Sequence, residues 1–168
     1  IELIDRKLSG ECFHQYLKPF LYQSAEDYSE VDLIAMGRLD DKPMFASVAD
    51  DLLKFIGSDE LVVFDKRKVI TFIENELGFV KGLEYNLGNN VIDVLTIANA
   101  RHPEQDNNFK NLYDRYYIDD FEHTGFIGAL LDAQMLADLY IVVTDENTKK
   151  IISDLTNYES GSNLITVE

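Results

Sequence analysis

The short apolar run ELVVFD, residues 60–65, lies between two segments whose apolar residues recur at helical spacing. A run of this length between helices is typical of a buried strand. The apolar positions before it are Phe45, Val48, Leu52 and Phe55, and those after it are Val69, Ile70, Phe72, Ile73 and Leu77. A strand enclosed by two helices is the arrangement of an α/β domain.

Other segments complete this pattern. Residues 1–8 and 11–17 partly alternate apolar and polar residues around Ser9-Gly10, which predicts a β-hairpin. A DKP signal at residues 41–43 starts the first helix, and Gly57 ends it. Further helices are predicted at residues 91–98, 109–116, about 125–142 and 147–155. We therefore expect one α/β domain over residues 1–168, with a mixed sheet flanked by helices.

Composition limits the class of protein. At 168 residues and 46% hydrophobic content, the chain can form one domain with a core. No apolar run approaches the ~20 residues that span a bilayer, and the first residues do not read as a secretion signal. We expect a soluble, cytoplasmic protein with no membrane partner. The single cysteine, Cys12, excludes an internal disulfide and a multi-thiolate zinc site.

Charge limits the partners. The chain has 15 Lys and Arg against 31 Asp and Glu, a net charge of −16, which repels nucleic-acid phosphates. We therefore expect weak or no binding of single-stranded DNA. Of the three histidines, His102 precedes Pro103, which predicts an exposed position in a loop.

Six stretches of the sequence resemble a known family when they are taken in order. They are RKLSGECFHQYLKP at 6–19, DKPMFASVADDLLKFI at 41–56, ELVV at 60–63, VIDVLTIA at 91–98, LYDRYYID at 112–119 and GALLDAQMLADLY at 128–140. The series resembles the exonuclease domain of the epsilon (proofreading) subunit of bacterial DNA polymerase III, in the DEDDh 3′–5′ exonuclease family. The match covers about residues 1–143, and residues 144–168 form a divergent C-terminal tail. The resemblance implies the ribonuclease H-like exonuclease fold.

The resemblance also implies a chemistry. In the family, four carboxylates hold two divalent ions, Mg²⁺ or Mn²⁺, and a histidine activates water that cleaves DNA from its 3′ end. Here the metal-binding aspartate of the second motif corresponds to Val69, and the histidine corresponds to Ile127. The first motif, Asp-x-Glu, is expected upstream of Ile1, so that the first central strand is missing or replaced. Asp132 alone matches a family metal ligand, as a vestigial position.

Two carboxylates and a basic triplet allow alternative interpretations. Asp132 by itself would face solvent, whereas the family match favours an inward position without metal. Asp93 matches a family aspartate near the site, but we favour a role as the N-cap of its own helix. Lys66, Arg67 and Lys68 lie beside the vacated position and could bind a phosphate or nucleic acid; solvated basic residues in a first helical turn are the favoured alternative.

Three functions stay open. The first is a degenerate, catalytically inactive relative of the epsilon exonuclease, acting as a structural or protein-binding module in DNA replication. It would bind a replicative polymerase subunit and would need no cofactor. The second is a fragment of an active 3′–5′ DNA exonuclease that uses Mg²⁺ or Mn²⁺, and the third is an acidic binding module unrelated to replication. Aliphatic residues at Val69 and Ile127 favour the first.

Overall fold

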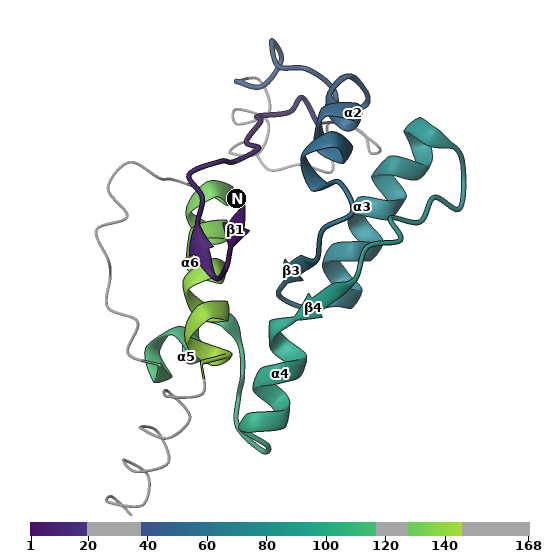
Figure 1. Ribbon diagram of the computed structural model, residues 1–168. Coiled ribbons are helices and arrows are strands. Elements are labelled where there is room, and N and C mark those ends of the chain that lie inside the picture. Colours follow the sequence, from purple (N-terminus) through teal and green to yellow (C-terminus); the bar gives the residue numbers. More distant parts are fainter. Residues whose placement is uncertain (20–37, 117–127, 146–168) are drawn as a thin grey trace, which may run out of the picture. The chain divides into compact units, whose positions relative to one another are not determined.

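A computed structural model of the chain describes residues 1–19, 38–116 and 128–145 (Figure 1). Its helices are α2 (Phe45–Ile56), α3 (Lys66–Lys81), α4 (Val94–Arg101), α5 (Phe109–Arg115) and α6 (Ala129–Val143). Its strands are β1 (Leu3–Ile4), β2 (Lys7–Leu8), β3 (Leu61–Val63) and β4 (Val91–Asp93). β1 pairs with β2, and β3 pairs with β4. The predicted mixed α/β class is confirmed, and none of the described helices has the length and apolar character to cross a membrane.

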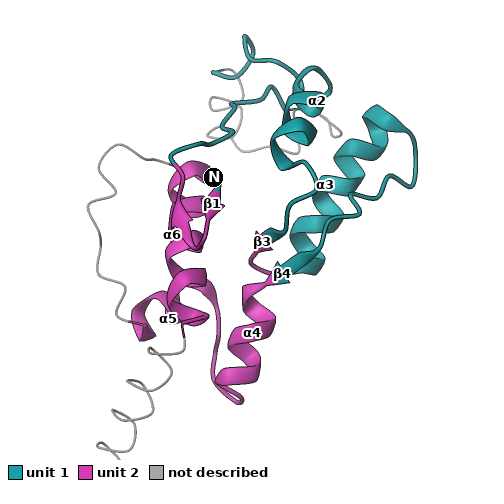
Figure 2. Cartoon of the chain, viewed as in Figure 1, with its two compact units in different colours: residues 1–2, 10–61, 66–92 teal, residues 3–9, 62–65, 93–168 magenta. Residues whose placement is uncertain are grey.

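The chain divides into two compact units (Figure 2). Unit 1 comprises residues 1–2, 10–61 and 66–92, and unit 2 comprises residues 3–9, 62–65 and 93–168. Unit 1 therefore holds helices α2 and α3. Unit 2 holds the β1–β2 hairpin and helices α4 to α6.

Unit 1 is built on the packing of α2 against α3. Ala49 of α2 and Leu77 of α3 are fully buried, each 0% exposed. Lys81, at the end of α3, forms an ion pair with Asp50 of α2. α2 ends at Gly57, whose φ of 55° is a conformation that glycine adopts without steric cost. The helix predicted between the DKP signal and Gly57 is thereby confirmed.

One apolar cluster forms the core of unit 2. Its buried members are Val94, Ala98, Leu112, Tyr116, Leu139 and Val143. They come from α4, from α5 and its C-cap, and from α6. Along α6 the partly buried Leu136 and the buried Leu139 and Val143 follow at spacings of three and four, which places them on one stripe of the helix.

The N-terminal hairpin turns at a different place from the predicted one. Its cross-strand partners are Leu3 with Leu8 and Ile4 with Lys7. The turn therefore falls on Asp5 and Arg6, not on Ser9-Gly10, and residues 11–17 form no strand. Both turn residues have positive φ, 49° and 64°, as a tight two-residue hairpin turn of type I′ requires.

Arg6 is anchored from far along the chain, which explains why a local pattern could not place this turn. Its Nη1 donates to Thr144 Oγ1 at 2.6 Å, and its Nη2 donates to the carbonyl oxygen of Ile141 at 2.5 Å. The guanidinium carbon also lies 5.7 Å from the ring centroid of Tyr140. These contacts hold the hairpin on the C-terminal end of α6 and offset the strain of a positive φ at a residue that is not glycine.

The helix predicted at residues 91–98 begins later than expected. Residues 91–93 form β4, and α4 starts at Val94. Val91 and Ile92 are β-branched, and β-branched residues favour an extended backbone. Val91 is also at helical spacing from later apolar residues, and this spacing led to the prediction of a helix. The helices predicted at residues 109–116 and about 125–142 are confirmed as α5 and α6. Residues 125–127 and the helix predicted at 147–155 lie outside the described residues.

Candidate functional site

The residues that the family resemblance singles out fall in both units. Val69 and the basic triplet Lys66, Arg67 and Lys68 belong to unit 1, whereas Asp93 and Asp132 belong to unit 2. Ile127 lies outside the described residues.

Lys66, Arg67 and Lys68 form the first turn of α3, and all three are exposed. This turn carries no acidic residue. Positive side chains at a helix N-terminus oppose the macrodipole, whose N-terminal end is itself positive. Lys68 takes part in a further interaction, so the triplet is not a set of three independent cations. An exposed first turn is the position that the sequence predicted; binding of a phosphate or nucleic acid stays a prediction.

Val69 follows this turn and is half-buried, next to the buried Ile70. An isopropyl side chain has no lone pair, so it cannot ligate a metal ion or accept a hydrogen bond from a bound water. Val69 therefore contributes packing to unit 1 and no charge.

Asp93 is the N-cap of α4, as the sequence predicted. Its Oδ1 accepts hydrogen bonds from the backbone N–H of Leu95 at 3.2 Å and of Asp65 at 3.0 Å. Its Oδ2 accepts from the hydroxyl of Thr96 at 2.7 Å. Both carboxylate oxygens are thus used to fix the start of α4 and the end of β3. Three of the about four lone-pair sites of this carboxylate are therefore used by donors within unit 2.

Asp132 lies in the first turn of α6, and its side chain is exposed. It stands four residues before Leu136 and so continues the stripe that Leu136, Leu139 and Val143 form along the helix. The core of unit 2 ends at Leu136, however, and the carboxylate beyond it remains in solvent. The expectation of an inward position is therefore wrong. A carboxylate in the first turn is favourable because it complements the positive end of the helix macrodipole.

Sequence reasoning missed a polar network in unit 2. His102 Nε2 lies 2.8 Å from Tyr116 Oη, and the amide of Asn107 is buried at 5% exposure. Asn107 Nδ2 donates to the carbonyl oxygen of His102 at 3.0 Å and to Asn99 Oδ1 at 2.9 Å. Arg115 Nη1 donates to Asn107 Oδ1 at 2.7 Å. These polar residues follow no helical or strand period, so no simple pattern could have found them.

The surroundings of this network shift two pKa values. Partial burial, followed by the positive charges of Arg115 and Arg101, lowers the pKa of His102 below its usual 6.5. Burial raises the pKa of Tyr116 above 10, against smaller opposing effects of Arg101 and Arg115. His102 is therefore mostly neutral at pH 7. It lies in the bend that follows α4, as predicted, but it is partly buried, so the expectation of an exposed side chain is wrong.

Side chains that could ligate a metal do not cluster among the described residues. In residues 1–19, 38–116 and 128–145, no three side chains of His, Cys, Asp or Glu gather as a metal ion would require. Asp93 is occupied by three donors, and Val69 offers no ligand atom. Asp132 is exposed at the start of α6.

Comparison with known proteins places the chain in a family. The sequence profile of the Exonuclease family matches residues 1–140. The chain is 39% identical over 150 residues to the DNA polymerase III subunit epsilon of Salmonella typhimurium, covering 88% of this chain and 61% of the relative. It is 37% identical to the same subunit of Escherichia coli, with the same coverage. The subunit of Haemophilus influenzae is 34% identical over 165 residues, covering 96% of this chain and 62% of the relative.

The chain thus spans less than two thirds of the length of the relatives it matches. Because the Exonuclease profile covers most of its residues, the chain belongs to the exonuclease family and is similar to epsilon subunits of DNA polymerase III.

Proposed function

We propose that this chain is an exonuclease-family domain that has lost catalysis and acts as a structural or protein-binding module in DNA replication. The observation that carries the proposal is Val69, an aliphatic, half-buried side chain at the position of a family metal ligand. Family catalysis needs carboxylates to hold two divalent ions, and a valine cannot replace one. The proposed fold is the ribonuclease H-like exonuclease fold of the family.

Further residues support the loss of catalysis. The sequence has Ile127 where the family has the histidine that activates water, so no general base stands at this position. Asp93 caps α4 with both of its oxygens. Asp132 keeps the identity of a ligand but is exposed. The proposal therefore includes no resident metal cofactor, and Asp132 is a vestigial ligand.

The partner follows from the relatives. The proteins that the chain resembles are named as subunits of DNA polymerase III. We propose a replicative polymerase subunit as the partner and the cytoplasm as the location. A net charge of −16 disfavours single-stranded DNA as a ligand, even with exposed cations at Lys66, Arg67 and Lys68.

Calorimetry and a nuclease assay test the proposal together. The purified protein is titrated with Mn²⁺, and release of nucleotides from a 3′-labelled single strand is measured with Mg²⁺ or Mn²⁺ present. The epsilon subunit of Escherichia coli serves as the positive control. We expect no saturable Mn²⁺ binding and no nucleotide release by this protein. Tight Mn²⁺ binding together with nucleotide release would establish an active exonuclease instead.

A binding assay tests the role in replication. The protein is mixed with the purified polymerase III subunits of its own organism and analysed by size-exclusion chromatography. Co-elution with one of them supports the replication role. If the nuclease assay is silent and none co-elutes, the acidic binding module outside replication becomes the better description.

A further inference from the structure

Helix α3 carries large apolar side chains that unit 1 does not bury. Phe72 and Phe79 are 66% and 67% exposed, and Leu83, just beyond the helix, is 87% exposed. The two phenylalanines are seven residues apart, so they lie on one face of α3. Grouped exposed apolar side chains on a soluble protein commonly mark an interaction site.

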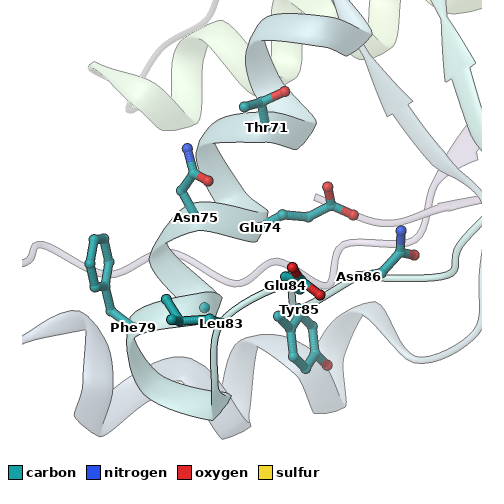
Figure 3. A pocket seen from close by; sticks show the side chains of 9 residues that line it. Thr71, Glu74, Asn75, Phe79, Leu83, Glu84, Tyr85 and Asn86 are labelled. Atoms are coloured by element: carbon teal, nitrogen blue, oxygen red, sulfur yellow. The ribbon is translucent and has the colours of Figure 1, made fainter.

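A pocket of about 540 Å³ opens beside this face (Figure 3). It lies between α3 and the segment of residues 83–86 that follows the helix, entirely within unit 1. Phe79, Leu83 and Tyr85 give it an apolar wall. We call this pocket the α3 groove. An apolar wall in a concave surface is suited to receive an apolar side chain.

Gly78 lines the α3 groove and keeps it open. A Cβ atom added at Gly78 would meet no other atom within 4 Å, so packing inside the chain does not require glycine here. Glycine is also a poor residue for a helix interior. Gly78 itself is buried, but a side chain added there would extend into open space beside the helix, which is the space that the groove offers to a bound side chain.

The charged residues that line the α3 groove are acidic. Glu74 and Glu84 lie in it, and no lysine or arginine is among its lining residues. Glu74 Oε1 accepts a hydrogen bond from the backbone N–H of Leu87 at 3.2 Å, which holds the segment after α3 against the helix. The nearby cation Lys81 is paired with Asp50 of α2. The lining therefore presents negative charge beside an apolar wall.

We propose that the α3 groove binds a basic segment of a protein partner, with an apolar side chain over Gly78 and a lysine or arginine against Glu74 and Glu84. The inference rests on the proposed function as a protein-binding module and names the chemistry of the bound segment. Complementary charge gives such a segment its orientation and speeds association. Nucleic acid is disfavoured by the acidic lining, and a second copy is disfavoured by the net charge of −16 on each chain.

Selection of peptides tests this proposal. A phage-displayed library of random peptides is selected on the purified protein, and the Kd of each enriched peptide is measured by fluorescence anisotropy. We expect an apolar residue flanked by lysine or arginine. Gly78→Leu, which fills the groove, and Glu84→Lys, which reverses its charge, should each weaken binding about tenfold or more.

Glu104→Lys is the matched control. Glu84 and Glu104 are both exposed and both have a φ of 66°, but Glu104 belongs to unit 2. The same charge reversal there should leave the Kd within about twofold. Gly78→Ala separates binding from folding, because alanine is the better helix former and should not lower the melting temperature. Weaker peptide binding by Gly78→Ala, without a lower melting temperature, would support the α3 groove as the binding site.

Several outcomes would overturn the proposal. Enriched peptides without basic residues would do so, as would binding that Gly78→Leu and Glu84→Lys leave unchanged. A dimer in sedimentation that Gly78→Leu dissociates would make a second copy the occupant. Nucleotide release in the nuclease assay would refute the loss of catalysis and leave the peptide result standing. If the nuclease assay shows no activity and the peptide selection also fails, the proposed binding by the α3 groove is refuted. The proposed loss of catalysis is then unaffected.

Discussion

The backbone N–H of Asp65 donates a 3.0 Å hydrogen bond to Oδ1 of Asp93, which stands 28 residues further along the chain. The same carboxylate caps α4 through Leu95 and Thr96. An aspartate that resembles one near the family site therefore connects the end of β3 with the start of α4. Its present role is structural, and substitution should be measured first as a change in stability.

Asp93→Ala should lower the free energy of unfolding by about 1–3 kcal/mol, because a helix cap and a long-range acceptor are lost together. Urea denaturation followed by circular dichroism measures the change. Asp93→Asn is the informative companion, since asparagine also caps helices well and keeps one acceptor oxygen. If Asp93→Asn lowered the free energy of unfolding as much as Asp93→Ala, the negative charge of the carboxylate, and not its acceptor geometry, would be what matters.

Arg6→Ala should destabilise the contact between the hairpin and α6 by about 0.5–1.5 kcal/mol. The substitution removes the hydrogen bonds to Thr144 and Ile141 and the contact with the Tyr140 ring. Arg6→Lys should recover only part of the loss, because an ammonium group lacks the planar fork of a guanidinium. Hydrogen exchange of the hairpin amides gives the local readout.

Lys7→Ala is the control for this experiment. Lys7 is an exposed cation in β2, directly after the turn. Its removal changes the net charge by the same amount as Arg6→Ala and should leave hairpin exchange unchanged. Equal effects of the two substitutions would mean that charge alone, and not the docking of Arg6, stabilises the hairpin.

Leu139→Ala should cost about 2–5 kcal/mol of unfolding free energy, because it opens a cavity in the core of unit 2. Leu139 is 0% exposed and belongs to the buried cluster. Leu83→Ala makes the same chemical change at a side chain that is 87% exposed and should shift stability by no more than about 0.5 kcal/mol. Thermal and urea unfolding compare the two variants. Equal losses would contradict the assignment of the core.

Local signals in the sequence explain which elements could be predicted. The DKP start signal and Gly57 delimit α2, and the apolar run before Asp65 contains β3. The hairpin turn at Asp5 and Arg6 could not be predicted, since the hydrogen bonds that hold Arg6 come from residues 135 and 138 positions away. A local sequence pattern therefore predicts the helices and strands that are stabilised by contacts among their own residues.

In the candidate site, too, local features could be predicted from the sequence and features set by distant packing could not. The cap role of Asp93 could be predicted, because an aspartate before a helical pattern accepts bonds from its own helix. The exposure of Asp132 could not, because its helical position matches that of core residues and only the extent of the core leaves it in solvent. Spacing gives the face of a helix, but tertiary packing decides how much of that face is covered.

His102 should make the stability of the protein depend on pH. Its pKa is lowered in the folded chain by partial burial and by the charges of Arg115 and Arg101, whereas in the unfolded chain it returns to about 6.5. Between these two values the unfolded chain binds more protons, so stability rises with pH. The contribution of neutral His102 is therefore complete above about pH 6.5 and is lost as pH falls through the folded pKa.

His102→Gln measures this contribution, because glutamine can still form a hydrogen bond with Tyr116 and does not titrate. We expect the free energy of unfolding to fall less steeply for the variant than for the unsubstituted protein between about pH 7 and 5. Since the two proteins have the same carboxylates, only the difference in slope reports on His102. Identical slopes for His102→Gln and the unsubstituted protein would show that His102 is protonated equally in both states.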